Sequence, residues 1–439
     1  MVHYIDFKKI MWNYALSGLM NRIRKTDVKH TDTGLKAEKN RQKRFCRKRN
    51  RPKMKERLVI IGANDFQNQL ISKAKDMGYE THVFAWQCGD VGEYNADYFY
   101  PISIVEKEQI LEKCREIQPV GVVSIASDLA NITVNYLAEH LGLIGNGIES
   151  TELATNKHKM RQVFASEELP SPKSALVTCA EDVRQLNFDY PLIVKPTDRS
   201  GSRGIYKIEA PDQLPDAIER ARSQSFEHGV LVEEFAEGNE YSVEYVSWEG
   251  EHHFLAITKK FTTGAPMFVE TAHIQPAYDL SVEMEEKIKL LVPRILDALN
   301  VRFGASHTEI KIDGNGCIKI IEAGARMGGD CIGSDLVFLS TGCDYVKMVI
   351  DIACGREPVF PDARQERCAA VFFVFSEEDL ERLKRVQEKY SSMIARVSMT
   401  EPFDGREIGD SSARYGYYLL SAARTEDMMQ VLQMMNLLP

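Results

Sequence analysis

Short apolar segments alternate with amphipathic segments over residues 58–150, and this alternation restricts the fold more than any other feature of the sequence. LVIIGAN, ETHVFAW and VGVVSIA are typical of buried strands, whereas QNQLISKAKDMGY, EKEQILEKCREIQP and ANITVNYLAEHLGL have helical spacing, two of them ending at glycine. Because this alternation favours a parallel sheet covered by helices, we predict an α/β fold. The GAN turn lacks the G-x-G-x-x-G pattern, so no dinucleotide site is predicted.

The rest of the chain has an α+β pattern. Helices are predicted over TNKHKMRQVFASEELPSP, DQLPDAIERARSQS, 281–299, GCDYVKMVIDIACG and TEDMMQVLQMM, and strands over YPLIVKP, IYKI, VLVEEF, EYSVEYVSW, AAVFFVF and YGYYLLSAA. Two strand pairs lie within 253–275 and 305–323. A chain of 439 residues is too long for one core, so we predict domains at 54–150, 151–360 and 361–439 after a separate segment, 1–53.

Residues 1–53 carry 16 Lys and Arg but only 4 Asp and Glu, in a protein whose net charge is -9. Such a segment is expected to be disordered, and it could serve as a nucleic-acid or anionic-membrane arm or as a targeting segment. We favour an over-long translation start, because Met54 directly precedes KERLVIIGAN, and we do not expect nucleic acid as a partner. The nine cysteines form no CxxC pair and no apolar run approaches the ~18 residues of a membrane span, so a cytoplasmic protein is predicted.

Two polar segments follow apolar strands in the middle of the chain. In IVKPTDRSGSRGIYKI, Lys195 ends a strand, and the backbone amides and hydroxyls of loop 198–204 could bind phosphate together with this lysine. The alternative is an ordinary polar hairpin with a lysine that reaches solvent. In VLVEEFAEGNE, the edge at Glu233 and Glu234 could bind a nucleotide base and Glu240 could bind ribose, although solvated turn residues are commoner.

Glu309 and Glu322 flank the DGNG turn and should lie on adjacent antiparallel strands. Two carboxylates brought together there repel each other unless a cation lies between them, and Mg²⁺ with phosphate oxygens suits such hard ligands. They could instead be unrelated surface residues. That alternative is weakened because both lie inside apolar strands, where unpaired carboxylates are costly.

Two further groups carry weaker signals by themselves. FVETAHIQPA contains Glu270 and His273, and a lone histidine is more often structural than catalytic. KIIEAGARMGGD places Arg326 and three glycines directly after a strand. This segment is either a tight bend after the strand or the edge of an active site, where Glu322 would bind a metal ion and Arg326 would bind an anion.

In this order and spacing, the NKxxMR segment, LIVKP, the Ser/Gly loop, VEEFxxGxE and the paired glutamates resemble the ATP-grasp superfamily of carboxylate–amine ligases, from about residue 57 onward. The resemblance implies an N-terminal parallel α/β domain, a central ATP-grasp domain of two α+β subdomains, and a small C-terminal α+β domain. It implies Mg²⁺ or Mn²⁺ at Glu309 and Glu322, and a mobile lid at 198–204. It assigns ATP binding to Lys157, Lys195, Ser200, Gly201, Ser202, Gly204, Glu233, Glu234, Phe235, Ala236 and Glu240.

The second metal strand departs from the E-x-N-P-R text of many members, because Gly324 replaces the asparagine that helps to hold a second Mg²⁺. This form is similar to the L-amino acid ligase branch, which also has Glu-x-x-His before proline. The similarity implies a substrate pocket at Glu270, His273, Arg326 and Gly329, catalytic roles for Lys195, Arg326, Glu270 and His273, and often a homodimer. The glycines would then let the backbone approach a substrate.

We therefore predict an ATP-dependent ligase that forms an amide bond between a small carboxylate and an amine through an acyl phosphate, releasing ADP and phosphate. One alternative is an enzyme resembling biotin carboxylase or carbamoyl phosphate synthetase that activates bicarbonate, although no biotin-carrier or amidotransferase segment is visible. A non-catalytic ATP-binding module is the other. The sequence does not identify the acid or the amine.

Overall fold

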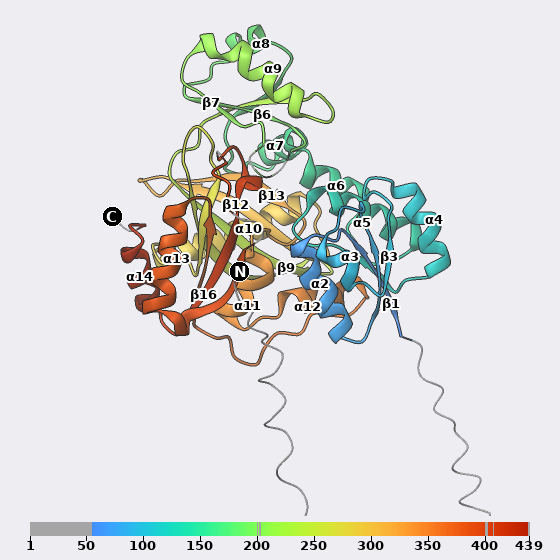
Figure 1. Cartoon of the computed structure of the whole chain (residues 1–439). Helices are drawn as coiled ribbons and strands as arrows, with labels where there is room; N and C mark the ends of the chain where they lie inside the picture. The colour runs from blue at the N-terminus through green and yellow to red at the C-terminus, as the bar shows by residue number, and fades with distance from the viewer. Residues whose placement is uncertain (1–54, 200, 202, 400–402, 407, 438–439) are drawn as a thin grey trace, which may run out of the picture. The chain divides into compact units, whose positions relative to one another are not determined.

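The computed structural model describes residues 55–199, 201, 203–399, 403–406 and 408–437. The predicted basic segment 1–53 and the predicted ATP-binding residues Ser200 and Ser202 lie outside this part. No helix in the described ranges is long and apolar enough to cross a bilayer. The unit that begins at Lys55 is organised by three sheets (Figure 1).

The first sheet is parallel, with strand order β3-β2-β1-β4, as the alternating pattern predicts. Its strands are β1 (Arg57–Ile61), β2 (Glu80–Phe84), β3 (Tyr98–Tyr100) and β4 (Gly121–Val123). Its helices are α2 (Asp65–Asp76), α3 (Val91–Asn95), α4 (Lys107–Ile117) and α5 (Asp128–Leu141). The short elements α3 and β3 are absent from the sequence prediction, because five and three residues show no clear periodicity.

The second sheet is antiparallel, with order β5-β8-β6-β7, and it belongs to a small subdomain drawn at the top of Figure 1. It contains β5 (Ser174–Val177), β6 (Leu192–Pro196), β7 (Tyr206–Ile208), β8 (Val230–Glu234), α8 (Ala180–Arg184) and α9 (Leu214–Gln224). The helices α6 (Ile148–Thr155) and α7 (Lys157–Ser166) precede this sheet in the chain.

The third sheet has eight antiparallel strands in the order β13-β12-β9-β10-β11-β14-β16-β15. They are β9 (Asn239–Trp248), β10 (Glu251–Thr262), β11 (Glu270–Gln275), β12 (Gly304–Ile312), β13 (Ile318–Gly324), β14 (Cys368–Val374), β15 (Ile394–Met399) and β16 (Gly416–Ala422). The strands from residues 368–422 therefore extend the sheet begun by the central segment. The domain boundary at residue 360 remains a prediction.

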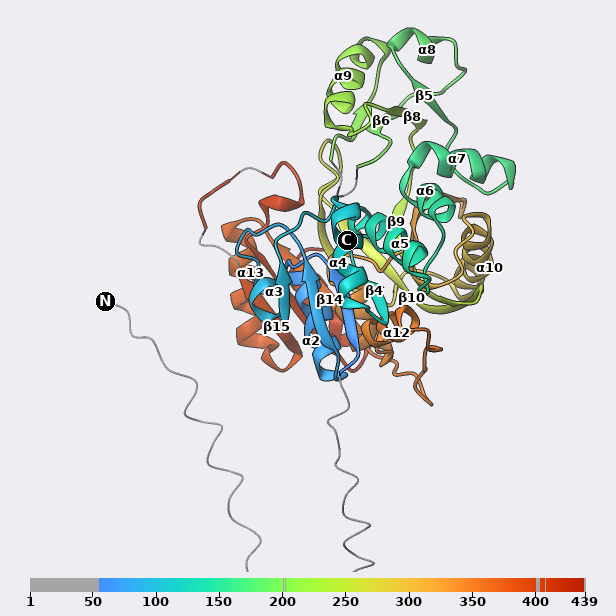
Figure 2. The same ribbon diagram turned by 90° about the vertical axis from the view of Figure 1, so that its right-hand side faces the viewer.

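Five further helices pack around this sheet: α10 (Val282–Ala298), α11 (Val337–Thr341), α12 (Tyr345–Ala353), α13 (Glu377–Lys389) and α14 (Thr425–Met434). The apolar face of α12 contacts both the parallel sheet and the large sheet, because Ile350 shares one buried cluster with Ile60 of β1 and Val246 of β9. At one point the fit is very close: a side chain on Gly121 would meet the carbonyl oxygen of Ala353 at 2.5 Å. Figure 2 shows α12 beside α2 and β4.

Candidate active site

Lys157 begins α7, and the local sequence explains its position. The side chain of Asn156 caps the helix by accepting hydrogen bonds from two backbone amides of the first turn, at 3.0 and 3.1 Å. The buried Nζ of Lys157 donates to the carbonyl oxygen of Arg199 at 2.8 Å and to Oε1 of Glu322 at 2.9 Å. Burial disfavours the ammonium ion, but the carboxylates of Glu322, Asp128 and Glu309 together raise the pKa of Lys157. The lysine is therefore a fixed positive charge.

The hairpin of β12 and β13 sets the two predicted metal ligands opposite each other. In its turn, Oδ1 of Asp313 accepts the backbone amides of Asn315 and Cys317 at 2.8 and 2.9 Å. The resulting register pairs Glu309 directly with Glu322. The prediction that these two carboxylates lie on adjacent strands is confirmed.

Lys260 of β10 links three of the predicted carboxylates. Its Nζ lies 2.6 Å from Oε1 of Glu309, 2.8 Å from Oε1 of Glu240 and 3.7 Å from Oε1 of Glu270. Burial acts to lower its pKa, but the three carboxylates raise the pKa of Lys260 well above 10.5. Burial also acts to raise the pKa of Glu309, and Lys260 together with His307 holds that pKa well below 4.5. Both side chains are therefore charged at neutral pH.

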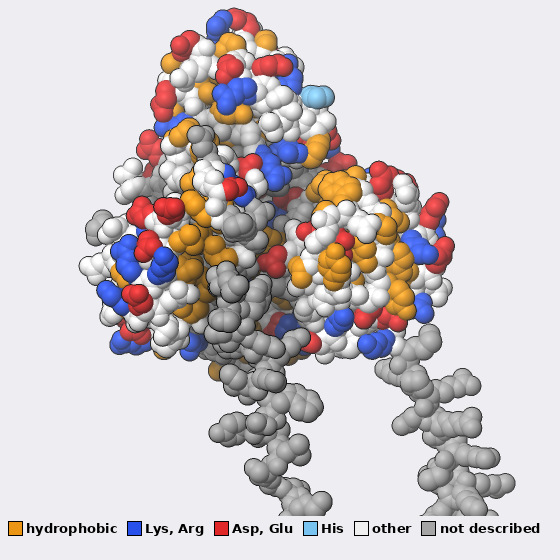
Figure 3. Space-filling view, in the orientation of Figure 1, with side chains coloured by type: hydrophobic (Ala, Val, Ile, Leu, Met, Phe, Trp, Pro, Cys, Tyr) orange, Lys and Arg blue, Asp and Glu red, His pale blue; other side chains and the backbone are white. Residues whose placement is uncertain are grey.

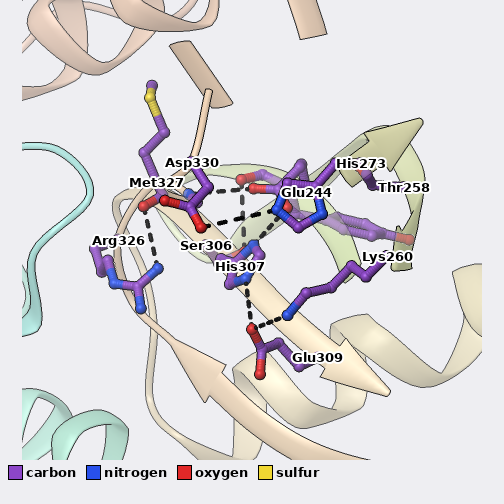
Figure 4. Close-up of polar contacts among 12 residues, drawn as sticks. Glu244, Thr258, Lys260, His273, Ser306, His307, Glu309, Arg326, Met327 and Asp330 are labelled. Carbon is purple, nitrogen blue, oxygen red and sulfur yellow. Dashed lines mark hydrogen bonds and ion pairs between the residues drawn. The ribbon is translucent and has the colours of Figure 1, made fainter. Parts of the chain in front are cut away.

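A buried imidazole supports Glu309 from the same strand (Figure 4). Nδ1 of His307 lies 2.6 Å from Oε1 of Glu244, and its Nε2 lies 3.2 Å from Oε1 of Glu309. Burial disfavours the imidazolium ion, but Glu244 and Glu309 raise the pKa of His307 to about 9. Protonated at neutral pH, His307 donates to both carboxylates and fixes the rotamer of Glu309.

Three buried charges join the small sheet to α7. Glu233 of β8 lies with Oε1 2.6 Å from Nε of Arg161 and with Oε2 2.6 Å from Nζ of Lys195. Burial acts to raise the pKa of Glu233, but Arg161 and Lys195 lower it. Burial also lowers the pKa of Lys195, against the effect of Glu233. Because both oxygens of Glu233 are engaged, its predicted contact with a nucleotide base would have to come from its backbone.

Arg326 is held by Asp128 of helix α5. Its Nε and Nη2 donate to the two carboxylate oxygens of Asp128 at 2.7 and 3.0 Å, and its Nη1 donates to the carbonyl oxygen of Met327 at 3.2 Å. A bidentate pair of this kind fixes the plane of the guanidinium group. Asp128 is the first residue of α5, so the N-terminal domain positions the predicted anion clamp.

The predicted substrate residues Glu270 and His273 adjoin an ion pair that the sequence did not reveal. Arg414 donates to Asp330 at 2.7 and 2.8 Å, and its Nη2 lies 3.7 Å from Oε2 of Glu270. Burial raises the pKa of Glu270, against the effect of Lys260. His273 is buried with Nε2 3.9 Å from Asp330, and neither of its ring nitrogens has a hydrogen-bond partner within the described ranges.

The two glycines after Arg326 differ in their surroundings. A Cβ on Gly328 would lie 2.6 Å from Nδ1 of His307, whereas the nearest neighbour of a Cβ on Gly329 would be Cβ of Ala126 at 3.7 Å. The close approach at Gly328 is thus to the His307 and Glu244 pair. Buried protein groups therefore exclude a side chain at Gly328, and the expectation that these glycines let the backbone approach a substrate stays a prediction.

Gly328→Ala should lower the free energy of unfolding by about 1–3 kcal/mol, because the added methyl group overpacks a rigid buried pair. Gly329→Ala is the matched control and should change it by less than about 0.5 kcal/mol, since its Cβ meets only ordinary contacts. Urea unfolding of both variants measures the difference. Equal effects would show that Gly328 does not pack tightly against His307.

One cavity collects most of the predicted residues. Of the fifteen that the structure describes, twelve line it: Lys157, Lys195, Gly201, Glu233, Glu234, Phe235, Ala236, Glu240, Glu270, Glu309, Glu322 and Arg326. Gly204, His273 and Gly329 are not among its lining residues. At Gly204, where φ is +73°, a side chain would lie 2.9 Å from Cγ of Pro196, so this glycine serves the turn itself.

Sequence reasoning missed several residues of this site. His307 lies two positions before Glu309, on the same face of the strand, and this spacing could have indicated it. Lys260 and Glu244 also lie on predicted strands, but no motif singles them out. Asp128 and Arg414 come from distant segments and could be placed only by the tertiary fold.

The donor set fits a magnesium–nucleotide complex. Mg²⁺ is usually held by one or two carboxylates together with substrate phosphates, and Glu309 and Glu322 provide two facing carboxyl groups in one cavity. No group of three or more His, Cys, Asp or Glu able to hold a metal ion occurs among the described residues.

Comparisons with known proteins bear on this site. The family model described as the ATP-grasp domain matches residues 188–334. Alanine–anticapsin ligase of Bacillus subtilis is 30% identical over 313 residues, which cover 62% of this chain and 65% of that protein. The carbamoyl phosphate synthase large chain of Thermotoga maritima is 25% identical over 296 residues, covering 63% of this chain but 26% of that protein. The chain thus matches less than two thirds of the length of these relatives.

Solved structures share the fold. An L-amino acid ligase from Bacillus licheniformis superimposes with a TM-score of 0.73 at 24% identity, covering 87% of this chain and 97% of that one. Phosphoribosylglycinamide synthetase from Anaerococcus prevotii gives a TM-score of 0.70 at 20% identity, covering 87% and 98%. The predicted ATP-grasp fold is confirmed. Residues 188–334 of this chain thus match the ATP-grasp domain, and the described part of the chain has the ATP-grasp fold.

Proposed function

We propose that this protein is an ATP-dependent carboxylate–amine ligase that joins a small carboxylate, such as an amino acid, to an amine. The observation that carries the proposal is the single cavity in which Glu309, Glu322, Lys157, Lys195 and Arg326 meet. The sequence similarity to alanine–anticapsin ligase supports the same reaction class. ATP and Mg²⁺, or Mn²⁺, are the proposed cosubstrate and metal.

The first step joins an oxygen of the substrate carboxylate to the γ-phosphorus of ATP, and ADP leaves. This transfer requires little covalent help from the protein, so positioning and charge neutralisation dominate. Mg²⁺ held by Glu309 and Glu322 would neutralise phosphate charge. Lys157, Lys195 and Arg326 would supply positive charge around the same cavity, and we assign Glu240, which also lines it, to the ribose hydroxyls.

In the second step the amine nitrogen attacks the acyl carbon, phosphate leaves, and the nitrogen loses a proton, which gives an amide. We propose that Glu270 binds the ammonium group of the amino acid whose carboxylate becomes phosphorylated, because the side chain of Glu270 lines the cavity beside Lys260. His273 lies behind it and would act by positioning. Loop 198–204, as a lid, would exclude water from the acyl phosphate.

We further propose that the substrates are small molecules, that the enzyme works in the cytoplasm and that it forms a homodimer. A second candidate function is activation of bicarbonate, which the similarity to carbamoyl phosphate synthase favours. Glu270 favours amino-acid substrates instead, because it lines the cavity and bicarbonate has no ammonium group for it to bind.

Phosphate release from ATP and Mg²⁺ by the full chain tests the proposal. Every pair of amino acids is supplied, with bicarbonate plus glutamine or ammonia as a separate arm. We expect release that requires two amino acids together and yields a dipeptide by mass spectrometry. Release with bicarbonate alone would support the second candidate. No release under any condition, despite measured ATP binding, would contradict both and favour a non-catalytic module.

A further inference from the structure

A second and larger cavity meets the first at its reactive end. Its volume is about 880 Å³, within the range of pockets that enclose small organic ligands. Lys157, Arg199 and Glu322 line both cavities. A molecule in the second cavity could therefore reach the metal glutamates without passing through the nucleotide-binding side.

The second cavity lies at the carboxyl edge of the parallel sheet, where α/β proteins commonly bind ligands. Trp86 follows β2, Asp128 follows β4 and begins α5, and Ile132 lies one turn further along α5. Phe226, which lies between α9 and β8, lines it from the small-sheet subdomain. The cavity is thus bounded by two subdomains.

Its wall exposes an unusual amount of apolar surface. Trp86 is 58% exposed and Phe226 is 63% exposed, and Val105, Ile132 and Ile148 are each more than a third exposed. All five line this cavity. Figure 3 shows hydrophobic side chains gathered on the N-terminal α/β part close below the small-sheet subdomain. Large apolar side chains grouped in this way at one hollow mark a binding surface.

Five basic and five acidic residues line this cavity, so their formal charges cancel, and some of them form ion pairs. Lys159 lies 2.5 Å from Glu152, Lys157 pairs with Glu322, and Asp128 holds Arg326. The guanidinium of Arg199 lies 4.3 Å from the ring centroid of Phe226 and has no ion pair with a carboxylate among the described residues. The cavity thus combines an apolar wall with charged residues, among which Lys157, Arg199 and Glu322 form the end that it shares with the first cavity.

In a ligase the amine attacks the acyl carbon of the acid substrate. The two substrates therefore need separate binding places that meet at this carbon. Of these two cavities, only the first is lined by Arg326 and Glu270, which suits the acid that becomes phosphorylated. We infer that the second cavity binds the amine substrate and selects amines with a bulky apolar body, aromatic or branched aliphatic. The amine nitrogen would lie at the Lys157 and Glu322 end, and the apolar body between Trp86 and Phe226. This inference rests on the proposed ligase activity.

Product order and amine selectivity test the inference. In reactions of alanine with leucine or phenylalanine, tandem mass spectrometry should place the bulky residue second, as the amine partner. Ile132→Trp, which fills the cavity from an exposed helix face, should raise the KM for leucine as amine about tenfold, while the KM for glycine as amine and the KM for ATP change less than about twofold. Leu290→Trp, at a residue on α10 that is 73% exposed and outside the cavity, is the matched control.

A bulky residue in the first position, or an equal rise of KM for leucine and glycine, would overturn the inference. If no pair of amino acids is ligated, the proposed function fails, and binding is measured directly. Leucine amide should then still shift the fluorescence emission of the wild-type protein but not of the Trp86→Phe protein. The absence of a Trp86-dependent shift would overturn the cavity assignment independently of activity.

Discussion

Glu322→Gln should reduce ATP-dependent ligation by about a thousandfold or more in kcat/KM, equivalent to about 4 kcal/mol of transition-state stabilisation. The substitution keeps the shape of the side chain but removes one of the two facing carboxylates proposed to hold Mg²⁺. It also leaves Lys157 without its carboxylate partner at 2.9 Å. Coupled phosphate release, with ATP and Mg²⁺ titrated separately, measures the loss.

Lys319→Gln is the matched control for this prediction. Lys319 lies on the same strand as Glu322 but is exposed to solvent, so the variant should retain wild-type activity. Circular dichroism should show that both variants are folded. Near-normal activity of Glu322→Gln, with unchanged dependence on Mg²⁺, would mean that this carboxylate is not a metal ligand.

Glu233→Gln should lower the free energy of unfolding by about 3–5 kcal/mol, because it leaves the charges of Arg161 and Lys195 buried without their shared carboxylate. The neighbouring Glu234→Gln is the control. Glu234 pairs at 3.1 Å with Lys173, whose side chain is 66% exposed, so its loss should cost less than about 1 kcal/mol. Denaturant unfolding of the two variants gives the comparison.

The ion pairs of Glu233 also predict how the free energy of unfolding depends on pH. The pKa of Glu233 is lowered in the folded protein, so its contribution to stability is fully present above the unfolded pKa of about 4.3. It is lost as the pH falls through the lower folded pKa. The stability difference between wild type and Glu233→Gln should therefore be constant from pH 6 to 8 and shrink toward pH 4 and below. A difference that grew on acidification would contradict the ion-pair assignment.

Local patterns were sufficient for much of the fold. Apolar runs such as LVIIGAN and helical spacing that ends at Gly142 depend on neighbours in the chain, and the structure has a strand and a helix at these places. Elements of three to six residues, such as β3 and β15, were missed because so few residues show no clear period. The missed α13 is longer, but its exposed, highly charged sequence gives it only two buried residues.

The sequence by itself determined the ATP-grasp resemblance, the hairpin that sets Glu309 against Glu322, and most of the residues that line the nucleotide cavity. Only the tertiary structure decided which charged groups neutralise the charged residues of the site. Lys260, Asp128 and Arg414 lie on segments that are distant in the chain from Glu309, Arg326 and Asp330, and their charges meet only after the sheets pack. Short-range patterns arise from backbone geometry, whereas ion pairing and cavity shape depend on side chains brought together across three sheets.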